Sequence, residues 1–326
     1  MANNHIIDNH QCQSRYAENM RTAAPAEMSS LRPRENFTRM IRRNASPVIS
    51  SLLLRPIAEF RPEWRSCARN APKQRPEGPH TSVASYNIHK CVGTDRRFDP
   101  ERTAAVIREI GADVLALQEA DKRFGERAGL LDLEDIGRET GLVPVPLSRR
   151  RKSHGWHGNV LLFRDGTIRD VREVTLPGVE PRGALMVDLD LTDGRLRVVA
   201  AHLGLLRRSR SKQVDMLLAE ALADSDTPTL LMGDLNERRD GTKSSLKALH
   251  EAFGPAHPPL PTFPSRFPIW PLDRVIANQR ELVAHVEVHD TPLARVASDH
   301  LPIKAAVKLA GEPTGESASD ALSVAA

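Results

Sequence analysis

Short hydrophobic runs alternate with polar segments between residues 81 and 310. Eight runs rich in Val, Leu and Ala, bounded by Gly, Asp, Asn or Pro, predict β-strands at 81–88, 112–120, 159–163, 184–191, 196–204, 227–235, 272–277 and 301–309. Helices are predicted over 100–110, 133–139, 211–222 and 242–253. In the third, Val214, Leu217 and Leu218 recur at helical spacing, so one face of that helix packs inward.

This mixture of elements predicts an α/β protein. In a simple doubly wound parallel sheet, strands and helices alternate, so eight predicted strands would need more than the four predicted helices. Two β-sheets packed together with helices outside them agree better with the pattern.

The two ends of the chain differ from its middle. Residues 1–80 lack sustained periodicity and are rich in Arg, Asn, Ser and Pro, which predicts a flexible, disordered basic leader that could make weak contact with an anionic surface. Residues 311–326 are small and polar and predict a disordered tail. We therefore expect a single catalytic domain over 81–310.

Composition and charge narrow the possible functions. The net charge is +4, but residues 1–80 hold 13 Lys or Arg against 7 Asp or Glu, so the remaining chain has 33 against 35 and is nearly neutral. A broad basic field for nucleic acid is not supported.

No apolar run is long enough to span a bilayer, and three distant cysteines do not predict a disulfide framework. We expect a cytoplasmic monomer without a transmembrane segment.

Polar side chains that can take part in catalysis or bind a metal lie where the predicted strands end. Because strand ends at one edge of a sheet converge on a crevice, we expect these residues to lie together. They are Asn87, Glu119, His202, Asp234, Asn236, Asp273, Asp299 and His300.

This set of side chains suits the hydrolysis of a phosphoester. The carboxylates of Glu119 and Asp299 are hard oxygen ligands for Mg²⁺ or Mn²⁺, and no Cys/His spacing of the zinc type is present. Asp234 can accept a proton from water, and His300 can bind a phosphoryl oxygen while Asp273 fixes its tautomer. Gly233 is expected to let the backbone turn tightly so that Asp234 and Asn236 point into the crevice.

The strings NIHK, LALQE, AHLGL, MGDLN, LDRV and SDHLP occur in this order over about residues 81–310. Together they resemble the endonuclease/exonuclease/phosphatase superfamily. The resemblance implies a four-layer α/β sandwich like that of DNase I, and a phosphohydrolase that uses a divalent metal. It further implies that Glu119, with Asn87 and Asp299 beside it, holds the metal.

The same resemblance implies catalytic roles for the other residues. Asp234 would position or deprotonate the attacking water, and Asn236 and His202 would stabilise the phosphoryl transition state. Asp273 would orient His300.

The substrate is left open between a phosphodiester of nucleic acid and a phospholipid head group or small phosphate ester. The only tyrosines are Tyr16 and Tyr86, and neither suits the phosphate pocket of abasic-site endonucleases, which disfavours that activity. Arg182, Arg207 and Arg208 are candidates for substrate binding, with exposed surface arginines as the alternative. A non-catalytic binding protein on the same fold is a third hypothesis.

Overall fold

A computed structural model describes residues 80–122, 127–147, 152–221, 227–254 and 257–309. The described residues all belong to one compact unit. The predicted leader, apart from His80, and the predicted tail lie outside the described residues, so those two predictions stay predictions. No helix in the described ranges is long and apolar enough to cross a membrane.

Eleven strands form two mixed sheets in the described chain. The first sheet has the order β10-β11-β1-β2-β4-β3, with bounds Val283–Val288, Ile303–Val307, Thr81–Asn87, Val114–Gln118, Val160–Phe163 and Val143–Pro144. The second has the order β5-β6-β7-β8-β9, with bounds Gly166–Leu176, Arg182–Leu191, Gly194–His202, Thr229–Asp234 and Asp273–Ala277.

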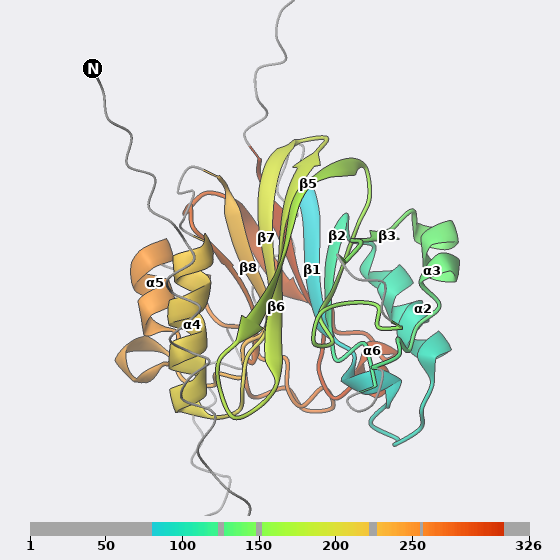
Figure 1. Ribbon diagram of the computed structural model, residues 1–326. Coiled ribbons are helices and arrows are strands. Elements are labelled where there is room, and N and C mark those ends of the chain that lie inside the picture. The colour runs from blue at the N-terminus through green and yellow to red at the C-terminus, as the bar shows by residue number, and fades with distance from the viewer. Residues whose placement is uncertain (1–79, 123–126, 148–151, 222–226, 255–256, 310–326) are drawn as a thin grey trace, which may run out of the picture. The chain divides into compact units, whose positions relative to one another are not determined.

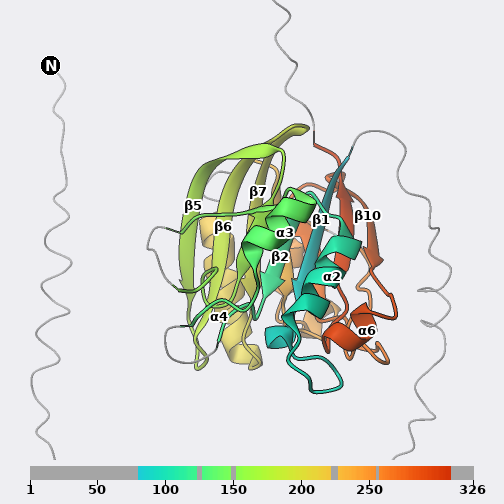
Figure 2. The ribbon, with the colours of Figure 1, turned by 90° about the vertical axis from the view of Figure 1, so that its right-hand side faces the viewer.

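Helices cover the outer face of each sheet (Figures 1 and 2). On the first sheet lie α2 (Pro100–Ile110), α3 (Leu133–Thr140) and α6 (Ala294–Ala297), and on the second lie α4 (Arg207–Ala221) and α5 (Lys247–Phe253). The helix α2 begins where the Asp99 side chain accepts a hydrogen bond from Arg102 N. It ends at Gly111, which adopts a left-handed conformation. The result is the predicted four-layer α/β sandwich.

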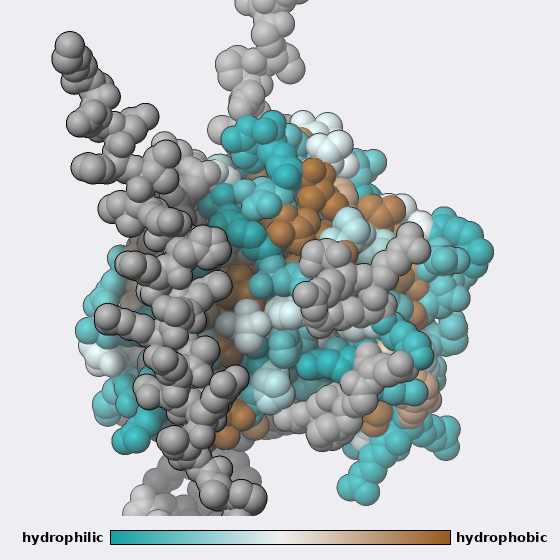
Figure 3. All heavy atoms as spheres, viewed as in Figure 1, coloured by the Kyte–Doolittle hydropathy of each residue, from teal (hydrophilic) through white to brown (hydrophobic). Residues whose placement is uncertain are grey.

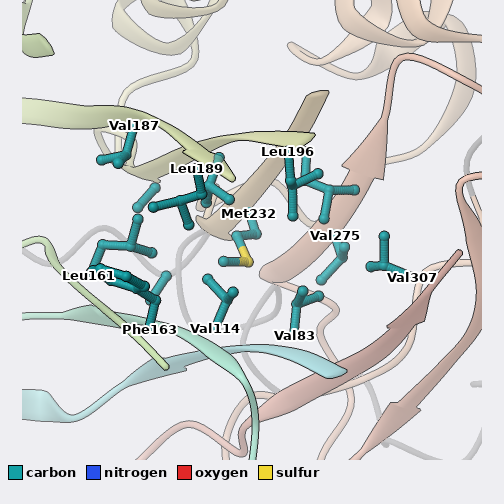
Figure 4. Packing of buried hydrophobic residues seen from close by; sticks show 14 of the residues in the cluster. Val83, Val114, Leu161, Phe163, Val187, Leu189, Leu196, Met232, Val275 and Val307 are labelled. Atoms are coloured by element: carbon teal, nitrogen blue, oxygen red, sulfur yellow. The ribbon is translucent and has the colours of Figure 1, made fainter. Parts of the chain in front are cut away.

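The inner faces of the two sheets form the central core (Figure 4). Val83 and Val114 of the first sheet pack in one cluster with Leu196 and Met232 of the second, and all four side chains are buried. Burying apolar area at about 25 cal/mol per Å² is the main contribution that holds the sheets face to face.

Two parallel strand pairs bring the polar strand ends to one edge. Asn87 at the end of β1 lies opposite Gln118 of β2, and His202 at the end of β7 lies opposite Asp234 of β8. The strand β9 runs antiparallel to β8, so its first residue, Asp273, also lies opposite Asp234. We call this edge the catalytic edge; it is the lower one in Figure 1, where α6 lies.

Several elements differ from those expected. The strands β5 and β10 were not predicted, since their charged and partly exposed residues, as in GTIRDVREVTL, hide the hydrophobic pattern of a sheet edge. The helix α4 begins at Arg207 rather than at residue 211, and α5 begins at Lys247 rather than at residue 242. The segment before α5 forms a short 3-10 turn, Gly241–Lys243.

Candidate active site

Asp234 is the meeting point of the polar residues on the catalytic edge. Its buried Oδ2 accepts a hydrogen bond from Asn87 Nδ2 at 2.9 Å. The same oxygen lies 3.4 Å from His202 Nε2 and 3.7 Å from His300 Nε2. Since Asn87 belongs to the first sheet and His202 to the second, this carboxylate joins the two sheets.

His300 is held by a carboxylate on its other ring nitrogen. His300 Nδ1 lies 2.8 Å from Asp273 Oδ2, and Thr262 Oγ1 donates to the same oxygen at 2.5 Å. The Phe263 ring packs against the imidazole with 4.8 Å between ring centroids. The imidazole is therefore held by Asp273 with Nε2 turned toward Asp234.

Gly233 does not form the tight turn that the sequence analysis predicted. It is a residue within β8, with φ +147°, and a Cβ built on it would lie 1.8 Å from the Ala201 carbonyl oxygen of the neighbouring strand. Glycine is required because two backbones approach closely, not because the chain turns there.

The turn itself follows Asp234. Asn236 has φ 51°, and its backbone N–H donates to Asp234 Oδ1 at 2.9 Å. Its side-chain nitrogen donates to the Leu203 carbonyl at 2.9 Å, so this amide ties the end of β8 to the chain after β7. Its predicted contact with a phosphoryl oxygen stays a prediction.

The cluster is strongly coupled electrostatically. Burial raises the pKa of Asp234 to about 6, although the His300 imidazolium and the Asn87 amide oppose the rise. Burial alone would lower the pKa of His300, but Asp273 and Asp234 outweigh it and raise this pKa to about 10. A protonated His300 therefore faces a carboxylate that titrates close to neutrality.

The predicted metal ligands lie around a strained turn after β1. His89, Lys90 and Cys91 all have positive φ, and so does Glu119 at 56°. The Lys90 ammonium forms an ion pair with the Glu119 carboxylate, and His89 Nδ1 lies 3.6 Å from Asp299 Oδ1. Burial tends to raise the pKa of Glu119, but the hydrogen bond and charge of Lys90 hold it below its ordinary value.

These residues fit a hard divalent cation by their chemistry. Glu119 already binds a cationic group, and Asn87 and Asp299 supply further oxygen atoms of the kind that Mg²⁺ and Mn²⁺ prefer. A second group, Asp234, Asp273 and His300, has ligand atoms within 4.8 Å of one another. Because Asp273 and His300 are bonded to each other, we interpret that group as a catalytic cluster and not as the metal site.

A polar pocket opens beside His202 and Glu119. Arg182 lines it and places Nη1 2.8 Å from His202 Nε2. Its predicted contact with the substrate stays a prediction. Arg207 and Arg208 do not line this pocket; they are exposed at the start of α4.

Sequence reasoning missed several supporting residues. Lys90, inside the quoted string NIHK, was not selected although it reaches Glu119. Glu180 binds Arg182 at 2.8 Å and accepts a hydrogen bond from Leu205 N. Thr262 lies in a segment of Pro and Phe residues that carries no catalytic pattern, and only the structure places it on Asp273. The ion pair of Arg127 with buried Asp121 adds a further cation to the pocket.

Comparison with known proteins agrees with this geometry. The sequence profile described as Endonuclease/Exonuclease/phosphatase family matches residues 84–300, which is more than half of the chain. The chain therefore belongs to the endonuclease/exonuclease/phosphatase family, whose members are typically phosphoester hydrolases and generally use divalent metals. No curated protein matches the chain.

Solved structures confirm the fold. An endonuclease/exonuclease/phosphatase from Beutenbergia cavernae has a TM-score of 0.54 at 22% identity, with 73% of each chain covered. One from Bacteroides vulgatus has a TM-score of 0.56 at 15% identity, covering 71% of this chain and 100% of the other. A mannosyl-6-phosphatase from Bacteroides thetaiotaomicron has a TM-score of 0.52 at 17% identity, covering 70% and 99%.

Proposed function

We propose that this protein hydrolyses phosphodiesters with the help of Mg²⁺ or Mn²⁺. The observation that carries the proposal is the single Asp234 carboxylate shared by Asn87, His202 and His300. A buried base beside a protonated imidazole is the arrangement needed to activate water next to a phosphoryl group. Family membership supports the general class of reaction.

The proposed residues divide the reaction between them. Asp234 accepts a proton as the water oxygen forms a bond to phosphorus. The imidazolium of His300 donates a hydrogen bond from Nε2 to a phosphoryl oxygen as the bond to the leaving oxygen breaks, and that oxygen takes a proton from solvent water and departs as an alcohol. His202 and Arg182 face the same phosphoryl group from the pocket side.

A divalent cation would be held by Glu119, Asn87 and Asp299. It would supply positive charge to the phosphoryl oxygens in the transition state. The Lys90 ammonium is paired with Glu119, so a bound cation would compete with Lys90 for this carboxylate.

The test is hydrolysis of bis-p-nitrophenyl phosphate with Mn²⁺ by the native protein and the variant Asp234→Asn. We expect kcat to fall by about 10²-fold or more, because the amide cannot accept the proton. The fold should survive with an unchanged or higher Tm. The raised pKa of Asp234 means that its ionised form costs stability at neutral pH, and asparagine removes that charge.

The matched control is Asp215→Asn, which removes an exposed carboxylate on α4 and should leave kcat unchanged. Equal activity of the native protein and Asp234→Asn, or full activity after removal of divalent metal with EDTA, would contradict the proposal. Hydrolysis of p-nitrophenyl phosphate but not of the diester would replace it with a phosphomonoesterase.

A further inference from the structure

Six large hydrophobic side chains are exposed on loops at the catalytic edge. Their exposed fractions range from 39% to 81%. We call this set the apolar rim: Val179, Leu205, Leu206, Phe267, Ile269 and Trp270. A small group of hydrophobic (brown) atoms is visible near the lower edge of Figure 3. Soluble domains rarely expose several large apolar side chains side by side unless that surface contacts another molecule.

The strand register places all of these loops at the same edge. The start of β6 pairs with the end of β7, Ala184 opposite Ala201, so the turn that carries Val179 lies beside the segment that carries Leu205 and Leu206. The loop that carries Phe267, Ile269 and Trp270 leads into β9, which begins opposite Asp234.

Direct contacts link these loops to one another. Leu205 N donates to Glu180 of the β5–β6 turn at 2.8 Å. The buried Arg210 and Glu237 form an ion pair that ties the start of α4 to the segment after β8. From that segment, the Arg238 guanidinium lies 5.6 Å from the centre of the Trp270 ring.

The charges on the same loops are almost all positive. In the segments 203–208, 236–243 and 264–271 the exposed charged residues are six basic ones and a single acidic one, Asp240. The basic residues are Arg207, Arg208, Arg238, Arg239, Lys243 and Arg266. Residues 81–326 as a whole are nearly neutral, with 33 basic and 35 acidic residues, so this local concentration of positive charge at the mouth of the site complements an anionic surface.

The side chains favour a lipid surface over nucleic acid. Four of the six rim residues are aliphatic, and Val, Leu and Ile side chains do not stack on bases. The Trp270 ring is already stacked with Phe263 at 5.9 Å and has Arg238 over it, which leaves little of its face for a base. Aliphatic and aromatic side chains mixed with arginines are instead typical of surfaces that insert at a membrane interface.

We propose that the apolar rim and its arginines dock the catalytic edge on an anionic membrane, so that the substrate is the phosphodiester of a phospholipid head group. This assignment rests on the proposed phosphodiesterase function. It accounts for Arg207 and Arg208, which lie outside the pocket but within the positive loops. Docking would present the head group to Asp234 and His300 while the acyl chains stay in the bilayer.

The experiment measures co-sedimentation of the full chain with phosphatidylcholine vesicles that contain or lack phosphatidylglycerol. All proteins carry Asp234→Asn so that no lipid is consumed. The triple variant Leu205→Ser, Leu206→Ser, Phe267→Ser should bind vesicles containing phosphatidylglycerol about tenfold more weakly, because it loses three partly inserted side chains. The control Val143→Ser removes an exposed side chain of β3 at the opposite edge and should bind normally.

The outcomes separate the two proposals. With Asp234 retained, the triple variant should hydrolyse soluble bis-p-nitrophenyl phosphate at the native rate. If the native protein does not hydrolyse this diester, the proposed function is contradicted, whereas vesicle docking is not. Equal vesicle binding by the triple variant and the control would overturn the docking proposal. The surface would be reassigned to nucleic acid if the Asp234→Asn protein binds a single-stranded oligonucleotide but not vesicles, and if the triple variant loses that binding.

Discussion

At the scale of single residues, the site depends on a carboxylate and an imidazole whose pKa values both lie above their ordinary values. Burial raises the pKa of Asp234 to about 6, and the two aspartates raise that of His300 to about 10. Near neutral pH, Asp234 is therefore mostly ionised while His300 keeps its proton. A base and a cationic hydrogen-bond donor are then present together, which an isolated pair of groups in water would not provide.

The pH dependence of catalysis follows from this pair. The value of kcat/KM for a soluble diester should fall as the pH drops below about 6, because protonated Asp234 cannot accept a proton. The variant His300→Gln removes the charge that lowers the pKa of Asp234, so this acidic limb should move to higher pH. A pH–rate profile measures it, with His285→Gln at the remote edge as control. An unmoved limb in His300→Gln would contradict the coupling.

The contribution of His300 to the stability of the folded protein is lost at alkaline pH. Since the folded-state pKa of His300 lies above its ordinary value, its contribution to stability is complete below about pH 6.5 and is lost as the pH rises toward 10.

At the scale of elements, the hydrophobic pattern predicted most of the interior and little of the periphery. The strands β1, β2, β7 and β8 were found because both of their faces are buried, and these strands carry Asn87, His202 and Asp234. The edge strands β5 and β10 were missed because their polar residues face solvent.

For the candidate site, too, the sequence indicated the residues on buried strands but not those in loops. Residues at the ends of buried strands could be found from the sequence, whereas Thr262 and Glu180 come from loops. Their roles depend on contacts across 11 and 25 residues that no local pattern encodes.

The close approach of β7 and β8 at Gly233 predicts an intolerant position. The change Gly233→Ala places a methyl group 1.8 Å from the Ala201 carbonyl oxygen, so we expect the free energy of unfolding to fall by about 3 kcal/mol or more. Gly241→Ala is the matched control, since Gly241 also has positive φ but has open space around it, and should cost about 1 kcal/mol. Urea unfolding measures both, and equal losses would mean that the approach of the strands does not matter.

At the scale of the whole molecule, both sheets, all the named site residues and the apolar rim lie between residues 80 and 309. The predicted boundaries of the catalytic domain can therefore be tested directly. A chain cut to residues 80–309 should keep its Tm within a few degrees and hydrolyse bis-p-nitrophenyl phosphate at the native rate. Loss of folding or of diester hydrolysis in this shortened chain would show that the domain extends beyond these limits.

The shortened chain can distinguish the contributions of two positively charged regions to vesicle binding. Residues 1–80 carry a net charge of +6, from 13 basic and 7 acidic residues, and the apolar rim has its own arginines. If the rim docks the protein on vesicles, the shortened chain should retain most of the vesicle binding. Co-sedimentation with and without the leader measures each contribution.

The strand β11 lies inside its sheet, between β10 and β1, although it is the last strand in the described chain. Ser298, just before it, donates to the carbonyl of Asn87 across 211 residues, and His300 follows two residues later. During synthesis, Asn87, His202 and Asp234 leave the ribosome well before this final strand. The cluster of Asn87, His202, Asp234 and His300 is therefore incomplete in the nascent protein until the segment before β11 has been made and packs against the end of β1.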